Sequence, residues 1–326
     1  MNIVFTNFCN TNCAYCFAKG KLNSAKNSKD SYINFRNLKI VIKFLKKSKQ
    51  AHVGIIGGEP TLHPKFKERV TMILDEGFHI QIYSNGIIKE DIVTFLESSD
   101  KNRWSMLLNI NQPESYTQKE WSKINRAMKT LNRQVTLGFT IYRINFNMDF
   151  IIGLINKYNL QRNIRVGIAN PLWGQNNKYL PLKDYNKVAP KIVEFARKCN
   201  DLDISLGFDC GFTLCSFTEK ECGQLFYYDS PLRAVCPLVI DVGPDLTLWR
   251  CFSNSMIWNR KLTDFKDLQE IYKFYINKFE AFRKVGVTNK CFRCKYLNRG
   301  QCSGGCLGYT LKSFGLENKL TSPEFL

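Results

Sequence analysis

Three cysteines stand close together near the amino end of the chain. Cys9, Cys13 and Cys16 form the pattern C-x3-C-x2-C, which a short loop can wrap around one centre. Structural zinc sites usually close four ligands, often as C-x2-C with a distant second pair, whereas three close thiolates without a nearby fourth leave a metal position open. An open iron position can bind a substrate or cofactor. A zinc loop, or a chance cluster of buried thiols, is the alternative interpretation.

A second set of cysteines lies in the carboxyl-terminal third. Cys236 and Cys251 are separated by fourteen residues, and a later run has the pattern C-x2-C-x7-C-x3-C. This ordered spacing indicates either iron–sulfur or zinc binding, because a zinc ribbon explains one C-x2-C with another pair. The four cysteines of the later run are Cys291, Cys294, Cys302 and Cys306.

The composition of the 326 residues is that of a folded globular protein, which we expect to stay in the cytoplasm. Apolar residues make up 44% and charged residues 23% of the chain, which is enough to build a core. No apolar run approaches the roughly 18 residues of a membrane-spanning helix, and no basic stretch followed by an apolar one opens the sequence. Disulfides rarely persist in the cytoplasm, so thirteen cysteines there favour metal binding.

The chain is strongly basic, with 47 Lys and Arg against 28 Asp and Glu and a net charge of +19. Such a charge can attract nucleic acid, an anionic membrane surface or an acidic peptide. The simpler interpretation is a lysine-rich and asparagine-rich composition with solvated faces on the helices. One predicted helix carries such a face, formed by Lys39, Lys43, Lys46 and Lys47.

Short apolar runs alternate with stretches of helical period over the first 170 residues, which predicts βα units in a parallel sheet. Six strands fall short of a closed eight-stranded barrel of about 250 residues, so we expect an open, partial (β/α)6 barrel of α/β class. The cysteine loop, Gly57–Pro60 and Ser84–Gly86 each follow a strand and should share one rim. The expected strands cover residues 2–6, 52–56, 79–83, 105–110, 136–142 and 164–169, and two of the helices cover 34–48 and 148–158.

The pattern changes near residue 172, where Trp173, Gly174 and Pro181 suggest a linker before a helix near 182–200. Ten of the thirteen cysteines occur from Cys199 onward. We therefore predict a core of residues 1–200 and a small carboxyl-terminal domain of residues 201–326.

The first cysteine motif, with Tyr15 at its aromatic position, resembles the C-x3-C-x-aromatic-C signature of the radical S-adenosylmethionine (SAM) superfamily. The resemblance implies that the three thiolates hold three irons of a [4Fe–4S] cluster, while SAM chelates the fourth. An electron from the cluster then cleaves SAM to methionine and a 5′-deoxyadenosyl radical, which abstracts a substrate hydrogen. Tyr15 would pack near the adenine.

Further stretches resemble SAM-binding elements of the same superfamily. Gly57, Gly58, Glu59 and Pro60 are similar to its GGEP motif, where backbone groups and Glu59 reach the ammonium of the methionyl moiety. Ser84 and Asn85 resemble its ribose-contacting stretch, and Asn109 occupies a position where a polar contact to SAM is usual. Arg143 is expected to meet the SAM carboxylate or, equally, to form a surface salt bridge.

The second cysteine field resembles the SPASM and twitch extensions of this superfamily, which hold one or two auxiliary [4Fe–4S] clusters. Cys236 and Cys251 match a pair across a β-hairpin, with Gly243 and Pro244 in its turn. The later run departs from the family by seven residues where five are usual, and no cysteine follows Cys306. Ser230 stands where an upstream cysteine is expected, which leaves open whether there is one auxiliary cluster or two. For a second cluster, Cys222 is predicted to serve as a ligand, with Cys215 and Cys210 as other candidates; the alternatives are a non-cysteine ligand and an iron left open for substrate.

These resemblances imply a radical SAM enzyme that oxidises or cross-links a peptide or protein, in the manner of maturases of ribosomally made peptides. The basic charge would suit an acidic leader, and an external donor such as flavodoxin or ferredoxin would supply electrons. Since Cys9 comes so early, leader capture is expected to need another protein or the core's own surface. The alternatives are a radical SAM dehydrogenase or modifier of small molecules and a non-catalytic iron–sulfur or zinc protein that binds nucleic acid. No catalytic acid or base is predicted.

Overall fold

The computed structural model describes residues 1–24 and 31–313. Two compact units can be distinguished by their internal contacts, and each is described by itself below. Unit 1 comprises residues 1–13, 18–135 and 238–278. Unit 2 comprises residues 14–17 and 136–237 and the described part of 279–326. The predicted division at residue 200 stays a prediction.

Unit 1 contains four neighbouring parallel strands whose apolar side chains are buried. Ile3 of the first strand pairs with Ile55 of the second, and Ile82 of the third pairs with Met106 of the fourth. Each strand begins and ends within one residue of its predicted bounds, because alternating or continuous apolar runs mark them. These strands are β1 (Asn2–Thr6), β2 (His52–Gly57), β3 (His79–Ser84) and β4 (Trp104–Asn109).

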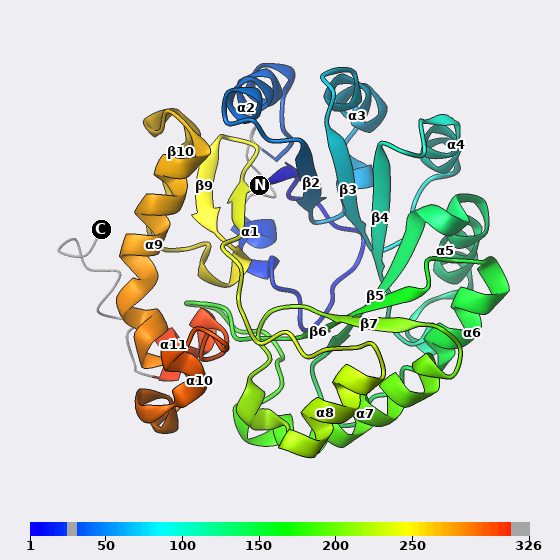
Figure 1. Ribbon diagram of the computed structural model, residues 1–326. Helices are drawn as coiled ribbons and strands as arrows, with labels where there is room; N and C mark the ends of the chain where they lie inside the picture. Colours follow the sequence, from blue (N-terminus) through cyan, green and yellow to red (C-terminus); the bar gives the residue numbers. More distant parts are fainter. Residues whose placement is uncertain (25–30, 314–326) are drawn as a thin grey trace. The chain divides into compact units, whose positions relative to one another are not determined.

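Three of the helices between these strands cover the sheet of unit 1. Figure 1 shows α2, α3 and α4 along the outer side of β2, β3 and β4. The predicted helix 34–48 is α2, whose first turn is capped by Asn34, since its side chain accepts a hydrogen bond from the backbone N–H of Asn37. The helices are α1 (Lys19–Ser24), α2 (Phe35–Lys47), α3 (Phe66–Asp75), α4 (Glu90–Ser98) and α5 (Gln118–Leu131).

A β-hairpin completes the sheet of unit 1 and confirms the predicted hairpin between Cys236 and Cys251. Strand β8 (Ile240–Val242) pairs parallel with β1 and antiparallel with β9 (Thr247–Arg250), which in turn pairs with β10 (Arg260–Lys261).

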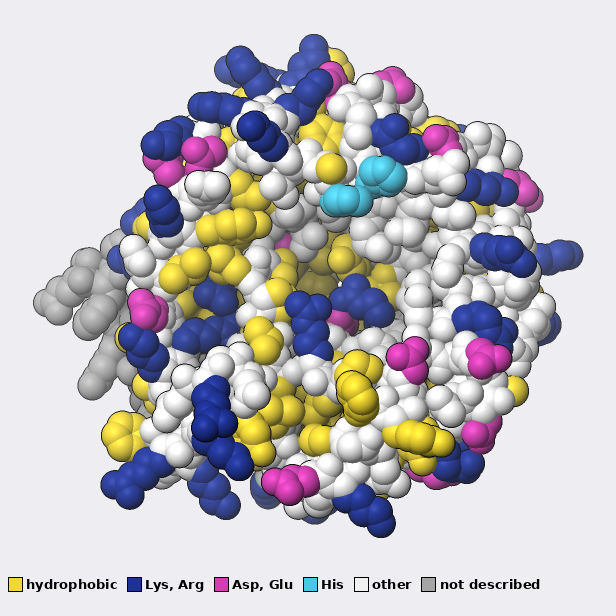
Figure 2. Space-filling view, viewed as in Figure 1, with side chains coloured by type: hydrophobic (Ala, Val, Ile, Leu, Met, Phe, Trp, Pro, Cys, Tyr) yellow, Lys and Arg dark blue, Asp and Glu magenta, His cyan; other side chains and the backbone are white. Residues whose placement is uncertain are grey.

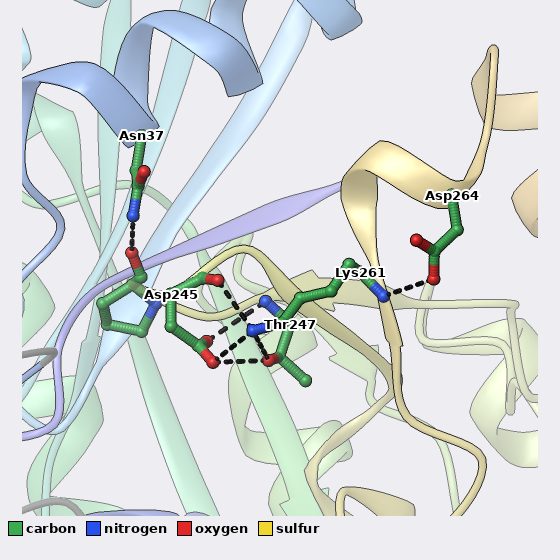
Figure 3. Close-up of polar contacts among 6 residues, drawn as sticks. Asn37, Asp245, Thr247, Lys261 and Asp264 are labelled. Atoms are coloured by element: carbon green, nitrogen blue, oxygen red, sulfur yellow. Dashed lines mark hydrogen bonds and ion pairs between the residues drawn. The ribbon is translucent and has the colours of Figure 1, made fainter.

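Polar contacts hold the turn of this hairpin, as Figure 3 shows. The ammonium of Lys261 lies 2.7 Å from Oδ2 of Asp245, which also accepts a 2.6 Å hydrogen bond from the hydroxyl of Thr247. The carbonyl of Pro244 accepts a 2.7 Å hydrogen bond from the side chain of Asn37 at the start of α2. The turn is therefore fixed against a helix of its own unit.

Unit 2 contains parallel strands in the order β5 (Val135–Ile141), β6 (Asn163–Ile168) and β7 (Ser205–Phe208). The first two match the prediction within one residue. The third was not predicted, because four residues that include Gly207 give too short an apolar alternation. The helices α6 (Asp149–Tyr158), α7 (Tyr185–Asn200) and α8 (Glu219–Tyr227) belong to this unit. Three further helices are α9 (Leu268–Val285), α10 (Lys295–Asn298) and α11 (Leu307–Ser313).

The surface carries the excess positive charge of the sequence. In Figure 2, Lys and Arg side chains are spread over the face that is shown and outnumber Asp and Glu. Within residues 1–24 and 31–313, no helix is long and apolar enough to cross a membrane.

Candidate functional site

The loop after β1 brings Cys9 and Cys13 around one hydroxyl group in unit 1. Oγ1 of Thr11 lies 3.2 Å from Sγ of Cys9 and 3.8 Å from Sγ of Cys13. Burial raises the pKa of the Cys9 thiol. A bound metal cation would oppose this effect, because a cysteine that ligates a metal must lose its proton.

The GGEP motif approaches this loop directly through its backbone. The N–H of Gly58 donates to the carbonyl of Thr6 at 2.9 Å, and the N–H of Glu59 donates to the carbonyl of Phe8 at 2.7 Å. A Cβ atom on Gly58 would lie 2.0 Å from the Phe8 carbonyl oxygen. Only glycine allows this approach, which fixes the chain immediately before Cys9.

The carboxylate of Glu59 is fully buried and joins the ends of β2 and β3. Its Oε1 accepts hydrogen bonds from the backbone N–H and the hydroxyl of Thr61 at 3.2 and 2.7 Å. Its Oε2 accepts one from the backbone N–H of Asn85 at 2.8 Å, and the Ser84 hydroxyl lies within 3.1 Å of both oxygens. Burial raises the pKa of Glu59, against the effect of these hydrogen bonds. The structure therefore makes Glu59 a positioning residue, and its predicted contact with the SAM ammonium stays a prediction.

Asn85 connects the end of β3 to the cysteine loop. Its Nδ2 donates to Oδ1 of Asn10 at 2.7 Å and lies 3.8 Å from Sγ of Cys9. Pro60 begins a short 3-10 helix, Pro60–Leu62, and Asn109 lies half-buried at the end of β4. Thus the structure brings the cysteine loop, the GGEP motif and Ser84–Asn85 together at the carboxyl ends of β1, β2 and β3. The SAM contacts predicted for Ser84, Asn85 and Asn109 stay predictions.

The remaining part of the first motif, residues 14–17, lies in unit 2. The ring of Tyr15 stacks on that of Tyr142, directly after β5, with centroids 4.8 Å apart. The backbone N–H of Lys178 donates to the carbonyl of Ala14 at 2.9 Å. The guanidinium carbon of Arg143 lies 5.3 Å from the centre of the Tyr142 ring. The aromatic residue of the motif therefore packs against the end of β5, while the adenine contact of Tyr15 and the carboxylate contact of Arg143 stay predictions.

A cavity of about 550 Å³ adjoins these residues in unit 2, and we call it the basic pocket. Tyr309, on α11, also borders it, and its N–H donates to the carbonyl of Cys306 at 3.0 Å. The pocket therefore lies next to residues that contact the first cysteine motif and next to the helix that follows Cys306. Its lining consists of Tyr142, Arg143, Asn177, Lys178, Tyr179, Pro181, Leu182, Lys183 and Tyr309.

The later cysteines of unit 2 lie in tight, glycine-rich turns. Cys291, Cys302 and Cys306 are buried. The N–H of Gly304 lies 3.3 Å from Sγ of Cys302, and a Cβ on Gly286 would lie 2.7 Å from Sγ of Cys291. Glycine backbone therefore lies directly against the sulfur atoms of Cys302 and Cys291. Cys294 belongs to the same run and is partly exposed.

The two cysteines predicted to flank the hairpin have different neighbours. The N–H of Cys236 donates to Oγ of Ser303 at 2.9 Å, which brings it next to Cys302 in unit 2. Cys251 follows β9 in unit 1, and Nδ2 of Asn254 donates to its sulfur at 3.2 Å. The proposed ligand role of both cysteines stays a prediction.

Cys222 and Cys210 differ in their surroundings. Cys222 lies on α8, where partial burial raises the pKa of its thiol and the charged groups that act on it are Glu221 and Glu219. Cys210 differs, because it lies close enough to Tyr185 to act on it together with Cys306. Both cysteines contribute to the raised pKa of Tyr185, although burial is its main cause. The surroundings of Cys222 give no support to its predicted ligand role, which stays a prediction.

Among the residues that the structure describes, no three His, Cys, Asp or Glu side chains lie close enough to hold a single metal ion. An iron–sulfur cluster makes a different demand, since its thiolates bind separate irons around a common core.

Two residues near the first motif were not predicted from the sequence. One is Thr11, although a hydroxyl between two cysteines of a metal-binding pattern is itself a signal for a hydrogen bond to sulfur. Tyr116 accepts a 2.8 Å hydrogen bond from the N–H of Asn111, and its pKa is raised to about 12 by burial, with Cys13 among the groups that act on it. No sequence pattern indicates that Tyr116 lies near Cys13.

Residues 3–156 match the family model described as the Radical SAM superfamily, and this range contains the three cysteines, the GGEP motif and β1 to β5. Residues 3–156 form a radical SAM domain. Radical SAM proteins use a [4Fe–4S] cluster and SAM, and the C-x3-C-x2-C donor set fits such a cluster.

Two curated relatives are similar to this chain over part of its length. A probable GTP 3′,8-cyclase of Methanocaldococcus jannaschii is 27% identical over 148 residues, which are 45% of this chain and 48% of the relative. A 7-carboxy-7-deazaguanine synthase of Clostridium acetobutylicum is 25% identical over 210 residues, which are 62% of this chain and 83% of the relative. The chain thus spans about half the length of the first relative.

Solved structures of SuiB from Streptococcus suis share the fold over most of the chain. The structure bound to SAM has a TM-score of 0.67 at 17% identity and covers 100% of this chain and 75% of SuiB. The structure bound to the precursor peptide SuiA has a TM-score of 0.65 at 16% identity, and the match covers 95% of this chain and 72% of SuiB. This likeness confirms the predicted α/β fold with the parallel strands of an open, partial barrel.

Proposed function

We propose that this chain is a radical SAM enzyme that modifies a peptide or protein by oxidation or cross-linking. When bound at Cys9, Cys13 and Cys16, the cluster and SAM would supply a 5′-deoxyadenosyl radical that takes a hydrogen atom from the substrate. The observation that carries the proposal is the basic pocket, which adjoins residues in contact with the first cysteine motif and the helix that follows Cys306.

The residues of unit 1 have a positioning role in this proposal. Gly58 and Glu59 fix the chain before Cys9, while Asn85 and Thr11 lie within hydrogen-bonding distance of its sulfur. Hydrogen bonds to thiolate sulfur favour the reduced cluster, because they stabilise added negative charge.

The later cysteines would hold one or two auxiliary clusters. A substrate that has lost a hydrogen atom must lose one further electron and one proton to complete a two-electron oxidation. An auxiliary cluster would accept that electron, and the proton would pass to solvent. Flavodoxin or ferredoxin would supply the electron that reduces the first cluster. The ligands proposed for the auxiliary clusters are Cys236, Cys251, Cys291, Cys294, Cys302 and Cys306.

The fold shared with SuiB, solved with its precursor peptide, supports a peptide substrate. The sequence relatives support a second candidate, a radical SAM modifier of small molecules, because the names of both refer to small molecules. A non-catalytic nucleic-acid-binding protein is the least supported, since it leaves the radical SAM domain unexplained.

The substrate class is tested by incubating the anaerobically reconstituted protein with SAM, dithionite and short peptides encoded beside its gene. We expect 5′-deoxyadenosine to form together with a peptide that has lost two hydrogen atoms, detected by mass spectrometry. Formation of 5′-deoxyadenosine with every peptide unchanged, and with a nucleotide or pterin consumed instead, would favour the small-molecule candidate.

A further inference from the structure

We infer that the basic pocket binds a carboxylate of the peptide substrate, an aspartate or glutamate side chain close to the residue that is modified. The inference rests on the proposed function, because it takes the substrate to be a peptide. It adds the chemical character of that peptide and the residues that recognise it.

The first support is the charge of the pocket. Arg143, Lys178 and Lys183 line it, and none of the described lining residues is Asp or Glu. The ammonium of Lys312 lies 5.1 Å from the ring centre of Tyr179, another lining residue, and so adds a fourth cation nearby. A concave surface lined by one sign of charge concentrates its field and attracts ions of the opposite sign.

The carboxylate of Asp184, which follows a lining residue in the sequence, forms an ion pair with a residue outside the pocket. Asp184 follows Lys183 directly, but its Oδ1 lies 2.7 Å from the ammonium of Lys187, one turn further along the chain. It therefore pairs with a lysine that does not line the pocket.

The second support is the size and wall of the cavity. Its volume of about 550 Å³ lies within the range of about 300–1,000 Å³ that is usual for ligand sites. Tyr142, Tyr179 and Tyr309 supply aromatic walls, and the rings of Tyr179 and Tyr309 meet edge to face with centroids 5.5 Å apart. Such walls favour an anion carried on a larger, partly apolar group, as in a peptide, over a free inorganic anion.

The third support is the position of the pocket within unit 2. Tyr142 stacks on Tyr15, and the backbone of Lys178 binds the carbonyl of Ala14, so two lining residues contact the first cysteine motif. A substrate anchored by its carboxylate would therefore lie beside Ala14 and Tyr15 of the first cysteine motif. Anchoring through a remote charge is an effective way to orient a reacting group.

The test measures binding, so it does not depend on turnover. Reconstituted holoenzyme saturated with SAM is titrated with fluorescently labelled acetyl-(Glu-Ala)3-amide and with the matched acetyl-(Gln-Ala)3-amide, and anisotropy is recorded. The double variant Lys178→Gln/Lys183→Gln is compared with Lys220→Gln, which removes an exposed lysine on α8 outside the pocket. Inorganic phosphate and N-acetylglutamate are each added as competitors.

We expect the Glu peptide to bind the wild type and Lys220→Gln equally and the double variant about tenfold more weakly, since each exposed ion pair contributes modestly. Binding should weaken as salt increases. Equal binding of the Glu and Gln peptides, or an equal effect of the double and control variants, would overturn the inference. Displacement by phosphate at lower concentration than N-acetylglutamate would also overturn it, because it would assign the pocket to a phosphate. The titration is repeated on holoenzyme without SAM, and peptide binding that is present without SAM but lost in the SAM-saturated sample would assign the pocket to the SAM carboxylate. If the Glu peptide binds as expected but no peptide is modified, the proposed function fails and the carboxylate site stands.

Discussion

Replacing Glu59 by glutamine keeps the size of the side chain but should destabilise the protein. Each carboxylate oxygen accepts a hydrogen bond from a backbone N–H, one from Thr61 and one from Asn85. Whichever way the introduced amide is oriented, its NH2 group faces a backbone N–H that cannot change its role. One buried donor is left unsatisfied, which costs about 1–3 kcal/mol, and the other hydrogen bond loses its charged acceptor.

Burial of a charge partly offsets this loss, because the raised pKa of Glu59 shows that its ionised form is disfavoured by desolvation. We therefore expect Glu59→Gln to lower the free energy of unfolding by about 2 kcal/mol. The assay is urea denaturation followed by circular dichroism. Glu76→Gln is the matched control, since Glu76 is exposed and pairs with Lys46 at the surface, and its effect should stay below about 1 kcal/mol. Equal stability of Glu59→Gln and Glu76→Gln would refute the hydrogen-bonding account.

Further variants test other parts of the structure. Gly58→Ala forces a Cβ against the Phe8 carbonyl and should prevent assembly of the first cluster, as counted by iron content and SAM cleavage. The control Gly153→Ala, in open space on α6, should instead raise the free energy of unfolding by about 0.5–1 kcal/mol. An intact cluster in Gly58→Ala would contradict the close approach of Gly58 to the Phe8 carbonyl. Thr11→Val removes a hydroxyl near two sulfur atoms and should lower the reduction potential of the first cluster by about 40 mV, the equivalent of one hydrogen bond of about 1 kcal/mol. The potential is measured in an EPR-monitored titration. An unchanged potential would show that the hydroxyl does not act on the cluster. Burial raises the pKa of Asp241 to about 7, so the folded protein keeps a proton that the unfolded chain loses above its ordinary pKa near 3.8, and stability falls as pH rises between these values. The free energy of unfolding of Asp241→Asn should therefore match that of the wild type near pH 4 and exceed it above pH 7 by at most about 4 kcal/mol. A difference in stability that does not grow with pH would argue against the raised pKa of Asp241.

The strands were predictable because their apolar patterns are local. β1 to β6 agree with the sequence within one residue. β7 was missed because it has only four residues and because its pairing with β6 depends on the intervening α7 rather than on its own composition. The hairpin β8–β9 was expected from the resemblance of Cys236 and Cys251 to a cysteine pair across a hairpin, with Gly243 and Pro244 in its turn.

The candidate site was predictable in its motifs but not in its contacts. The GGEP pattern indicates a close backbone approach, which Gly58 makes, yet nothing local shows that Glu59 is buried with donors from β3. The basic pocket could not be predicted from the sequence for the same reason. Its residues come from three distant segments, and Lys178 lies in a stretch that the sequence presents as a linker.

The most direct test of the account is whether this chain cleaves SAM at the first cysteine motif. The protein is reconstituted anaerobically with iron and sulfide, given dithionite and SAM, and assayed for 5′-deoxyadenosine by chromatography. Cys199→Ala is the control for Cys13→Ala, because Cys199 is a buried thiol on α7 outside every motif. We predict 5′-deoxyadenosine from the wild type and from Cys199→Ala, and none from Cys13→Ala while the iron of the other sites is retained. A wild-type sample with its cluster intact that forms no 5′-deoxyadenosine would contradict the central claim.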